Sequence, residues 1–279
     1  MSEPAKLAAG LEPVAAGGLV LLGCGKMGGA MLDGWFAAGL PGAAVHVVDP
    51  ALGERAAALT ARGARCGLKP PDSAAAVVVA VKPQLLAEAL PAVAPLAGPR
   101  TLFMSIAAGA PLSYFEARLA AGTPIVRAMP NTPAAVGRGV TALFANAPGK
   151  ALTPLAEALA GAVGETVRLE SEAQMDAVTA VSGSGPAYVF HMIEALAAAG
   201  VAEGLPEELA MRLARATVTG AGELAHGSPL PASALREAVT SPAGTTAAGL
   251  SVLMGDGALI DLMRRTVAAA AARSRELGG

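Results

Sequence analysis

The chain has 279 residues, of which 53% are hydrophobic, 15% are charged and only 3% are aromatic, and its formal net charge is −2. This length accommodates one large domain or two ordinary ones, and the balanced charge gives no argument for a basic patch that binds nucleic acid or an acidic membrane surface. Two cysteines without metal spacing, and a start without a signal-peptide pattern, predict a reduced, cytoplasmic protein.

Residues 1–17 are mostly small, and we expect a flexible leader there. The apolar run 19–22 then predicts a buried parallel strand, and apolar residues at helical spacing follow from Met31. Between strand and helix lies a G-x-G-x-x-G turn, the context that a dinucleotide requires. Its first glycine makes the turn, its second admits the pyrophosphate and its third allows close helix packing. The predicted cofactor-binding residues of this turn are Gly23, Cys24, Gly25, Lys26, Met27 and Gly28.

Asp49 follows the next predicted strand, 45–48, and is a further candidate cofactor-binding residue. A carboxylate at this position accepts a hydrogen bond from the ribose 2′-hydroxyl of NAD and repels the 2′-phosphate of NADP. Arg55 follows closely and opposes that repulsion, so the sequence leaves open whether the cofactor is NADPH or NADH. The alternative role for Asp49 is that of a solvated acid leading into Pro50.

The rest of the first half alternates between strand and helix. Strands are predicted at 75–81, 102–106, 125–129, 139–145 and 166–169, with a helix near 152–163. This alternation predicts an α/β Rossmann domain with a doubly wound, mainly parallel sheet, which we assign to residues 18–170 as the NAD(P)-binding domain. Strand ends line the ligand crevice of such a sheet. The candidate cofactor-binding residues at strand ends are Ala80, Val81, Lys82, Pro83 and Asn131. A plain turn between two prolines is the alternative for Asn131.

Residues 171–279 have a helical pattern with little strand signal. Helices are predicted at 187–199, 206–225 and 259–277, with shorter pieces between the last two. The many Ala and Gly residues on these helices allow close approach, and their apolar surface favours a homodimer. We therefore predict an all-α C-terminal domain for dimerisation and substrate binding.

A loop rich in hydroxyl groups runs into the helical pattern near residue 245. Four hydroxyl residues surround Pro242 and Gly244, and no charged residue lies between Ala238 and Gly255. A structural helix start needs one capping hydroxyl, whereas free helix N-terminal amides suit an anion such as a small carboxylate. We predict that this loop holds the substrate. The alternative is a helix N-cap with no ligand.

The titratable residues offer little chemistry of their own. The three histidines, His46, His191 and His226, fall within a predicted strand, within a helix and at a helix end. No metal spacing and no nucleophile elbow is present in the sequence, so we expect no metal site. Hydride transfer to a C=N bond fits this inventory because the nitrogen can carry its own proton. The protein then supplies orientation, a dry pocket and a hydroxyl hydrogen bond.

Five motifs stand in a fixed order along the chain. They are Gly23-Cys24-Gly25-Lys26-Met27-Gly28, Ala80-Val81-Lys82-Pro83-Gln84, Met129-Pro130-Asn131-Thr132-Pro133, Ser182-Gly183-Ser184-Gly185-Pro186-Ala187-Tyr188 and Val239-Thr240-Ser241-Pro242-Ala243-Gly244-Thr245-Thr246. In this order they resemble the pyrroline-5-carboxylate reductase family, and the resemblance covers nearly the whole chain after about residue 18. The last two motifs are far more specific than the glycine turn.

The resemblance implies reduction of 1-pyrroline-5-carboxylate to L-proline by NAD(P)H, the last step of proline biosynthesis. It also implies a Rossmann domain, a helical dimerisation domain, sites completed across a homodimer and, in some members, a higher ring of dimers. Thr246 matches the family threonine placed near the ring nitrogen, as hydrogen-bond partner or proton donor. The substrate-binding residues expected on this basis are Ser184, Ser241, Ala243, Gly244, Thr245 and Thr246. One departure is visible, because the family usually has two glycines where this chain has Ala243-Gly244, and alanine is strained if that position needs a positive φ.

Two other functions fit parts of the pattern. A non-enzymatic NAD(P)-binding sensor or scaffold would keep the glycine turn and would not need the hydroxyl-rich loop. A β-hydroxyacid dehydrogenase shares the two-domain plan, but that class needs a helix lysine as acid or base. The last lysine of this chain is Lys150, before the helical half begins.

Overall fold

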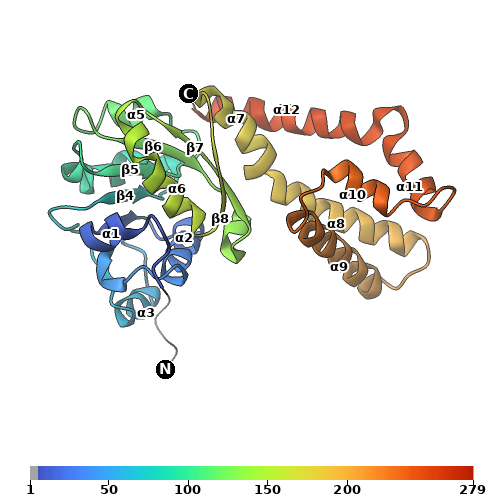
Figure 1. Cartoon of the computed structure of the whole chain (residues 1–279), viewed down its shortest axis with the longest axis horizontal. Coiled ribbons are helices and arrows are strands. Elements are labelled where there is room, and N and C mark those ends of the chain that lie inside the picture. The colour runs from blue at the N-terminus through green and yellow to red at the C-terminus, as the bar shows by residue number, and fades with distance from the viewer. Residues whose placement is uncertain (1–5, 279) are drawn as a thin grey trace. The chain divides into compact units, whose positions relative to one another are not determined.

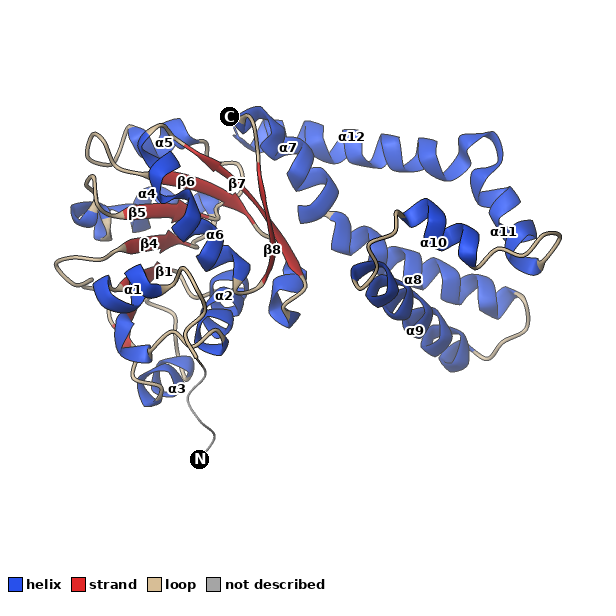
Figure 2. Cartoon of the chain, viewed as in Figure 1, coloured by secondary structure: helices blue, strands red, loops and turns tan. Residues whose placement is uncertain are grey.

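The computed structural model describes residues 6–278. Within this range eight strands form one sheet in the order β3-β2-β1-β4-β5-β6-β7-β8 (Figures 1 and 2). The strands are β1 (Leu19–Leu22), β2 (Val45–Val48), β3 (Arg65–Cys66), β4 (Ala76–Val79), β5 (Leu102–Ser105), β6 (Ile125–Met129), β7 (Gly139–Ala145) and β8 (Gly164–Arg168). Neighbouring strands are parallel except β6 with β7. The order of the first six strands is that of a dinucleotide-binding Rossmann sheet, which confirms the predicted fold of the first half.

Helices cover both faces of this sheet. Alternate residues of one strand enter two separate cores: Leu19 and Leu21 pack on one face, and Val20 and Leu22 pack on the other. The helices of this part are α1 (Glu12–Gly17), α2 (Lys26–Ala37), α3 (Arg55–Ala61), α4 (Leu86–Ala89), α5 (Leu112–Glu116), α6 (Thr153–Gly161) and α7 (Met175–Val178). Buried side chains of α1, α2, α3 and α6 fill the first core, and those of α4 and α5 fill the second. Strands buried on both faces explain the unbroken apolar runs in the sequence.

The expectation of a flexible leader over residues 1–17 is wrong for residues 6–17, and residues 1–5 lie outside the described range. Residues 12–17 form α1, and both Leu11 and Val14 are fully buried against the first core. The Ala8 N–H also donates to the Ala38 carbonyl at 2.8 Å. Two apolar side chains three residues apart therefore anchor a segment whose composition resembles that of a linker.

The chain divides into two compact units. The first runs to Gly183 and also includes the last residues from Ala271, and the second covers Ser184–Ala270. This boundary differs from the expected one at 170/171 because α7 and the turn after it pack with the sheet unit. The end of the last helix does the same, since the Ser274 hydroxyl donates to Asp176 Oδ1 at 2.6 Å.

The second unit is entirely helical in the described residues, as predicted. Its helices are α8 (Gly185–Ala202), α9 (Glu207–His226), α10 (Ala232–Ala238), α11 (Thr245–Met254) and most of α12 (Ala258–Gly278). α8 and α9 pack as a hairpin through the buried alanines Ala197, Ala210 and Ala214. A Cβ added at Gly200 would lie 3.3 Å from the Ala210 Cβ, so small residues set the helix spacing.

Candidate active site

The glycine turn lies between β1 and α2, at the carboxyl end of β1. Gly23 has a φ of +89°, and a Cβ there would lie 2.8 Å from a Val81 methyl group, so this position needs glycine. A Cβ at Gly28 would collide with the Gly23 carbonyl oxygen. The first and third glycines therefore serve the tight turn and the close helix packing that the sequence predicts.

Gly25 differs from its two neighbours in the motif, because a Cβ there would meet no atom within 4 Å. It is exposed and forms the N-cap of α2, whose first turn has no side-chain cap and no acidic residue. The free amides of this helix start therefore face open space. Such an arrangement suits a phosphate group. The turn therefore fits a dinucleotide pyrophosphate.

Asp49 lies beside this turn. Its Oδ2 accepts a hydrogen bond from the Cys24 N–H at 2.6 Å, and its Oδ1 accepts one from the Ala51 N–H at 2.7 Å. The Cys24 thiol is buried, and burial is the main reason that its pKa is raised. The nearby charges act on the same pKa, which Arg55 lowers and which Asp49 and Asp33 raise. A buried thiol of raised pKa is not a reactive thiolate.

The segment Ala80–Pro83 adjoins the glycine turn across the β1–β4 pair. The Ala80 N–H donates to the Leu22 carbonyl at 2.7 Å, and Gly23 packs on Ala80 and Val81. Lys82 is exposed and leads into a short 3-10 turn, Pro83–Leu85. The structure thus brings two of the expected cofactor-binding segments together at one sheet edge.

Asn131, after β6, is buried and makes internal hydrogen bonds. Its Nδ2 donates to the Ser182 carbonyl at 3.2 Å, and its Oδ1 accepts from the Val140 N–H at 2.9 Å. Ser182 belongs to a π-helical turn, Thr179–Gly183, that precedes Ser184 and α8. π-Helical turns are frequent at functional sites. Asn131 therefore does more than form a plain turn, because it ties the end of β6 to this turn.

The hydroxyl-rich loop precedes α11 in the helical unit. Gly244 is the N-cap, and the first turn of α11 has no side-chain cap and no acidic residue. Among the described residues, the exposed hydroxyls of Thr245 and Thr246 have no hydrogen-bond partner within the chain. The Thr240 hydroxyl, by contrast, donates to the Arg236 carbonyl at 2.6 Å. Ala243 has a φ of +58°, the left-handed conformation that favours glycine.

Comparison with known proteins identifies the family to which this chain belongs. Residues 172–277 match the model for pyrroline-5-carboxylate reductase dimerisation, and residues 19–109 match the model for NADP oxidoreductase, coenzyme F420-dependent. The pyrroline-5-carboxylate reductase of Pseudomonas aeruginosa is 39% identical over 263 residues, which cover 93% of this chain and 96% of the relative. This chain belongs to the pyrroline-5-carboxylate reductase family. The reductase of Methanosarcina acetivorans is 38% identical over 92% of this chain and 96% of its own length.

Solved structures agree with this assignment. A pyrroline-5-carboxylate reductase from Coxiella burnetii superposes with a TM-score of 0.88 at 33% identity, and covers 94% of this chain and 99% of its own. The Plasmodium falciparum pyrroline carboxylate reductase, solved with NADP bound, has a TM-score of 0.76 at 28% identity, over 94% and 98% of the two chains. The confirmed fold is thus a Rossmann domain followed by a helical dimerisation domain.

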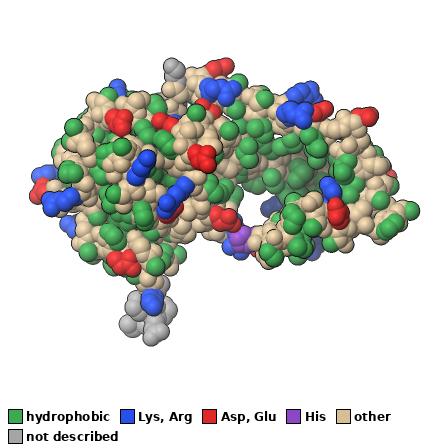
Figure 3. Space-filling view, turned by 45° about the horizontal axis from the view of Figure 1, so that its top comes forward, with side chains coloured by type: hydrophobic (Ala, Val, Ile, Leu, Met, Phe, Trp, Pro, Cys, Tyr) green, Lys and Arg blue, Asp and Glu red, His purple; other side chains and the backbone are tan. Residues whose placement is uncertain are grey.

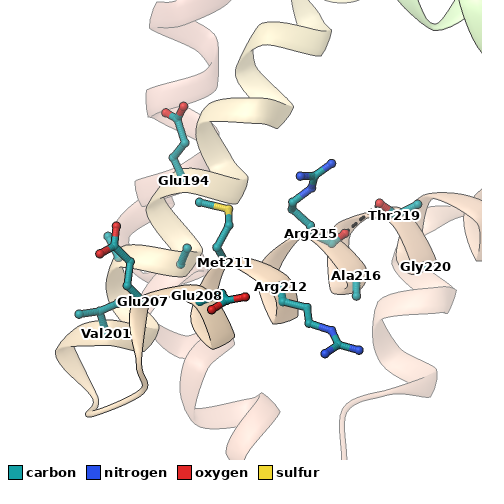
Figure 4. A pocket seen from close by; sticks show the side chains of 12 residues that line it. Glu194, Val201, Glu207, Glu208, Met211, Arg212, Arg215, Ala216, Thr219 and Gly220 are labelled. Carbon is teal, nitrogen blue, oxygen red and sulfur yellow. Dashed lines mark hydrogen bonds between the residues drawn. The ribbon is translucent and has the colours of Figure 1, made fainter.

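The dimerisation domain of this reductase carries an unusual surface for a single chain. Large apolar side chains are exposed along its helices (Figure 3), among them Phe190, Leu224 and Val252. A cavity of about 1400 Å³ opens between α8 and α9, with Glu194, Met211, Arg212 and Arg215 on its walls (Figure 4). The stretches Glu172–Ala202 and Thr245–Gly278 are also long and apolar enough to cross a membrane, by length and composition alone. The dimerisation model matches the same residues, so a partner subunit accounts for their apolarity.

Several contacts that shape the reductase were not found from its sequence. The Glu172 carboxylate binds both Arg127 Nη1 at 2.9 Å and the Leu112 N–H at 2.8 Å, which ties β6 to the start of α5. The two-residue strand β3 and the π-helical turn were also missed. Pairs so distant in the chain leave no local pattern. Arg127 lies on an otherwise apolar strand, and this was the signal in the sequence that it needs a partner.

Proposed function

We propose that this chain is an NAD(P)H-dependent pyrroline-5-carboxylate reductase, which reduces the C=N bond of 1-pyrroline-5-carboxylate to give L-proline in the last step of proline biosynthesis. Its substrate is a small cyclic imino acid, and it is an oxidoreductase acting on a C=N group. Family membership over 93% of the chain supports this function. At the level of residues, the main support for this function is that two helices, α2 and α11, begin in the same way.

Both α2 and α11 begin at a glycine, with no side-chain cap and no acidic residue in the first turn. A helix start of this kind presents free N–H groups and the positive end of the helix dipole. The first lies in the dinucleotide turn and suits the pyrophosphate. The second carries Thr245 and Thr246 and suits a carboxylate, which the substrate supplies.

The roles of the residues follow from these two sites. When bound, NAD(P)H supplies a hydride to the imine carbon. The turn Gly23–Gly28, together with Ala80, Val81, Lys82 and Pro83, binds the dinucleotide and fixes its orientation. The loop of Ser241, Ala243, Gly244 and Thr245 binds the substrate carboxylate, with Ser184 as a further substrate contact. The Thr246 hydroxyl hydrogen-bonds the ring nitrogen and directs the face that reacts.

Asn131 is a candidate cofactor-binding residue by sequence, and its side chain makes two hydrogen bonds within the chain. We propose that Asn131 acts mainly as a positioning residue for the π-helical turn before Ser184, because both its amide atoms already have partners in the chain.

The direct test is consumption of NADH or NADPH with 1-pyrroline-5-carboxylate, followed by absorbance. We expect turnover with the cyclic imine and little with open-chain 2-oxo acids. The opposite preference would exclude this function. The product should be identified as L-proline by chiral chromatography.

Turnover of the unmodified protein excludes a non-enzymatic NAD(P)-binding sensor, and Thr246→Val tests the role of the Thr246 hydroxyl in that turnover. We expect kcat to fall about 10- to 100-fold, because one transition-state hydrogen bond is lost, while NAD(P)H affinity stays unchanged. Thr60→Val is the matched control, since the Thr60 hydroxyl lies on exposed α3 and donates to the Ala56 carbonyl at 2.9 Å. Equal turnover in both variants would contradict the proposed role of the Thr246 hydroxyl.

The assembly and location complete the proposal. We propose a homodimer formed through residues 172–277, with further assembly into a ring of dimers, and a cytoplasmic location without nucleic-acid or membrane partners. Size-exclusion chromatography with light scattering measures the assembly directly. A single dimer mass would exclude the ring, and a monomer mass would exclude both.

A further inference from the structure

The end of β2 carries a carboxylate that the protein holds in place. Asp49 accepts hydrogen bonds from two backbone N–H groups, Cys24 on the glycine turn and Ala51 on the following loop, at 2.6 and 2.7 Å. The turn is itself fixed there, because the Gly23 N–H donates to the Val48 carbonyl at 2.9 Å. Asp49 is thus an oriented acceptor beside the dinucleotide turn.

The cation that could offset this charge is engaged elsewhere. Arg55 Nη2 donates to Asp33 Oδ2 at 3.0 Å and to the Gly29 carbonyl at 3.2 Å. Its guanidinium packs so closely on α2 that a Cβ at Gly29 would lie 2.9 Å from Arg55 Cζ. Arg55 is therefore already paired with Asp33, a carboxylate other than Asp49.

The other arginines of the same segment have partners too. The guanidinium carbon of Arg62 lies 4.1 Å from the centre of the Phe36 ring, and Arg65 Nη2 donates to the Ala43 carbonyl at 3.5 Å. Both arginines make these contacts away from the end of β2. A 2′-phosphate placed there would meet a fixed negative charge, whereas a ribose 2′-hydroxyl can donate a hydrogen bond to it.

We propose that this reductase prefers NADH to NADPH, with Asp49 as the residue that sets the preference and Asp33 as the residue that withholds Arg55 from a 2′-phosphate. The inference rests on the proposed function, because it concerns the cofactor of that reaction. It goes beyond the family, since a relative of this fold was solved with NADP bound. The choice therefore depends on residues of this chain rather than on the fold.

Binding of the oxidised cofactors to the full-length protein tests the proposal without any imine substrate. Isothermal titration calorimetry should give a Kd for NAD+ at least about tenfold lower than for NADP+. In Asp49→Asn the ratio of the NADP+ Kd to the NAD+ Kd should fall by about tenfold. The substitution removes the repulsion of the 2′-phosphate and weakens the hydrogen bond to the ribose 2′-hydroxyl. Equal or tighter binding of NADP+ by the unmodified protein would overturn the proposal, as would an unchanged ratio in Asp49→Asn.

Asp33→Asn and Asp72→Asn complete the series. Asp33→Asn should tighten NADP+ binding severalfold and leave NAD+ binding unchanged, because Arg55 is released. An unchanged ratio there would overturn the role of Asp33. Asp72→Asn makes the same charge change at an exposed position shortly before β4, away from the carboxyl edge of the sheet, and should leave both Kd values unaltered. Comparing 5′-AMP with 2′,5′-ADP on the unmodified protein isolates the 2′-phosphate and needs no variant.

Failure of this inference and failure of the proposed function give different results. An enzyme that reduces the imine and binds NADP+ more tightly than NAD+ contradicts only the cofactor preference. A protein that binds NAD+ more tightly and reduces no imine with either cofactor contradicts only the reductase reaction.

Discussion

At the scale of single residues, Ala243 adopts a conformation that suits glycine. Its φ of +58° lies in the left-handed region, which is unfavourable for an alanine by about 1–2 kcal/mol. Ala243→Gly removes that strain but also frees the unfolded chain, so we expect a gain of below about 1 kcal/mol in the free energy of unfolding. Ala243→Val should lose stability and raise KM for the imine, because a β-branched side chain fits this region poorly. Urea unfolding at one fixed protein concentration measures these changes in stability. Equal stability of the unmodified protein, Ala243→Gly and Ala243→Val would contradict the strain at Ala243.

Gly25 is the residue at which a small change should abolish cofactor binding without disturbing the fold. Its φ is −67° and its Cβ position is open, so valine fits the protein alone and fills the space proposed for the pyrophosphate. We expect Gly25→Val to weaken NADH binding more than about tenfold, as judged by titration calorimetry. The melting temperature should stay the same. Gly98→Val is the control, because that position is equally open in the structure. Unchanged NADH affinity in Gly25→Val would remove the assignment of the turn.

At the scale of elements, Asn131 joins the end of β6, the start of β7 and the π-helical turn before α8. Asn131→Ala leaves the Val140 N–H and the Ser182 carbonyl without their partner, a loss of about 1 kcal/mol for each of these half-buried hydrogen bonds. We expect lower thermal stability and a raised KM for the imine, with little change in cofactor affinity. The neighbouring Thr132 is exposed, and Thr132→Ala should be neutral. If both substitutions have the same effect, the bridging role of Asn131 is wrong.

At the scale of the whole molecule, the helical unit lacks a core of its own. Its buried cluster consists of Ala197, Ala210 and Ala214, while Phe190 keeps 62% of its surface exposed. Three alanines bury too little apolar surface to hold five helices, so a partner subunit must cover the rest. We expect the unfolding midpoint to rise with protein concentration and Phe190→Glu to shift the protein to monomers on size-exclusion chromatography. Leu68→Glu is the matched control, since Leu68 is 64% exposed and lies outside the dimerisation match. If Phe190→Glu stays a dimer, as Leu68→Glu should, the α8 surface does not form the dimer interface.

Local patterns in the sequence determined the strands other than β3, the glycine turn and the helical second half, because each depends on neighbours within a few residues. They also located the hydroxyl-rich start of α11. The family resemblance added that alanine at position 243 is strained if that position needs a positive φ, and the structure gives it a φ of +58°. A leader was predicted for residues 6–17 because composition alone does not reveal that Leu11 and Val14 enter a core built from later strands. The family dimerisation match begins at residue 172, next to the predicted boundary, whereas the compact units divide after Gly183. The contact between Asp176 and Ser274, which joins segments distant in the chain, is one reason for that difference.

Only the tertiary structure decided which partner each charge and amide takes. The sequence placed Asp49 and Arg55 close together and left the cofactor open, whereas the fold turns Arg55 toward Asp33 and Asp49 toward the Cys24 amide. Asn131, a candidate cofactor ligand by sequence, likewise donates to the Ser182 carbonyl of a distant segment. The physical reason is that secondary structure follows short-range periodicity and backbone preference. The pairing of polar groups depends on which distant segments the packed core brings within hydrogen-bond distance.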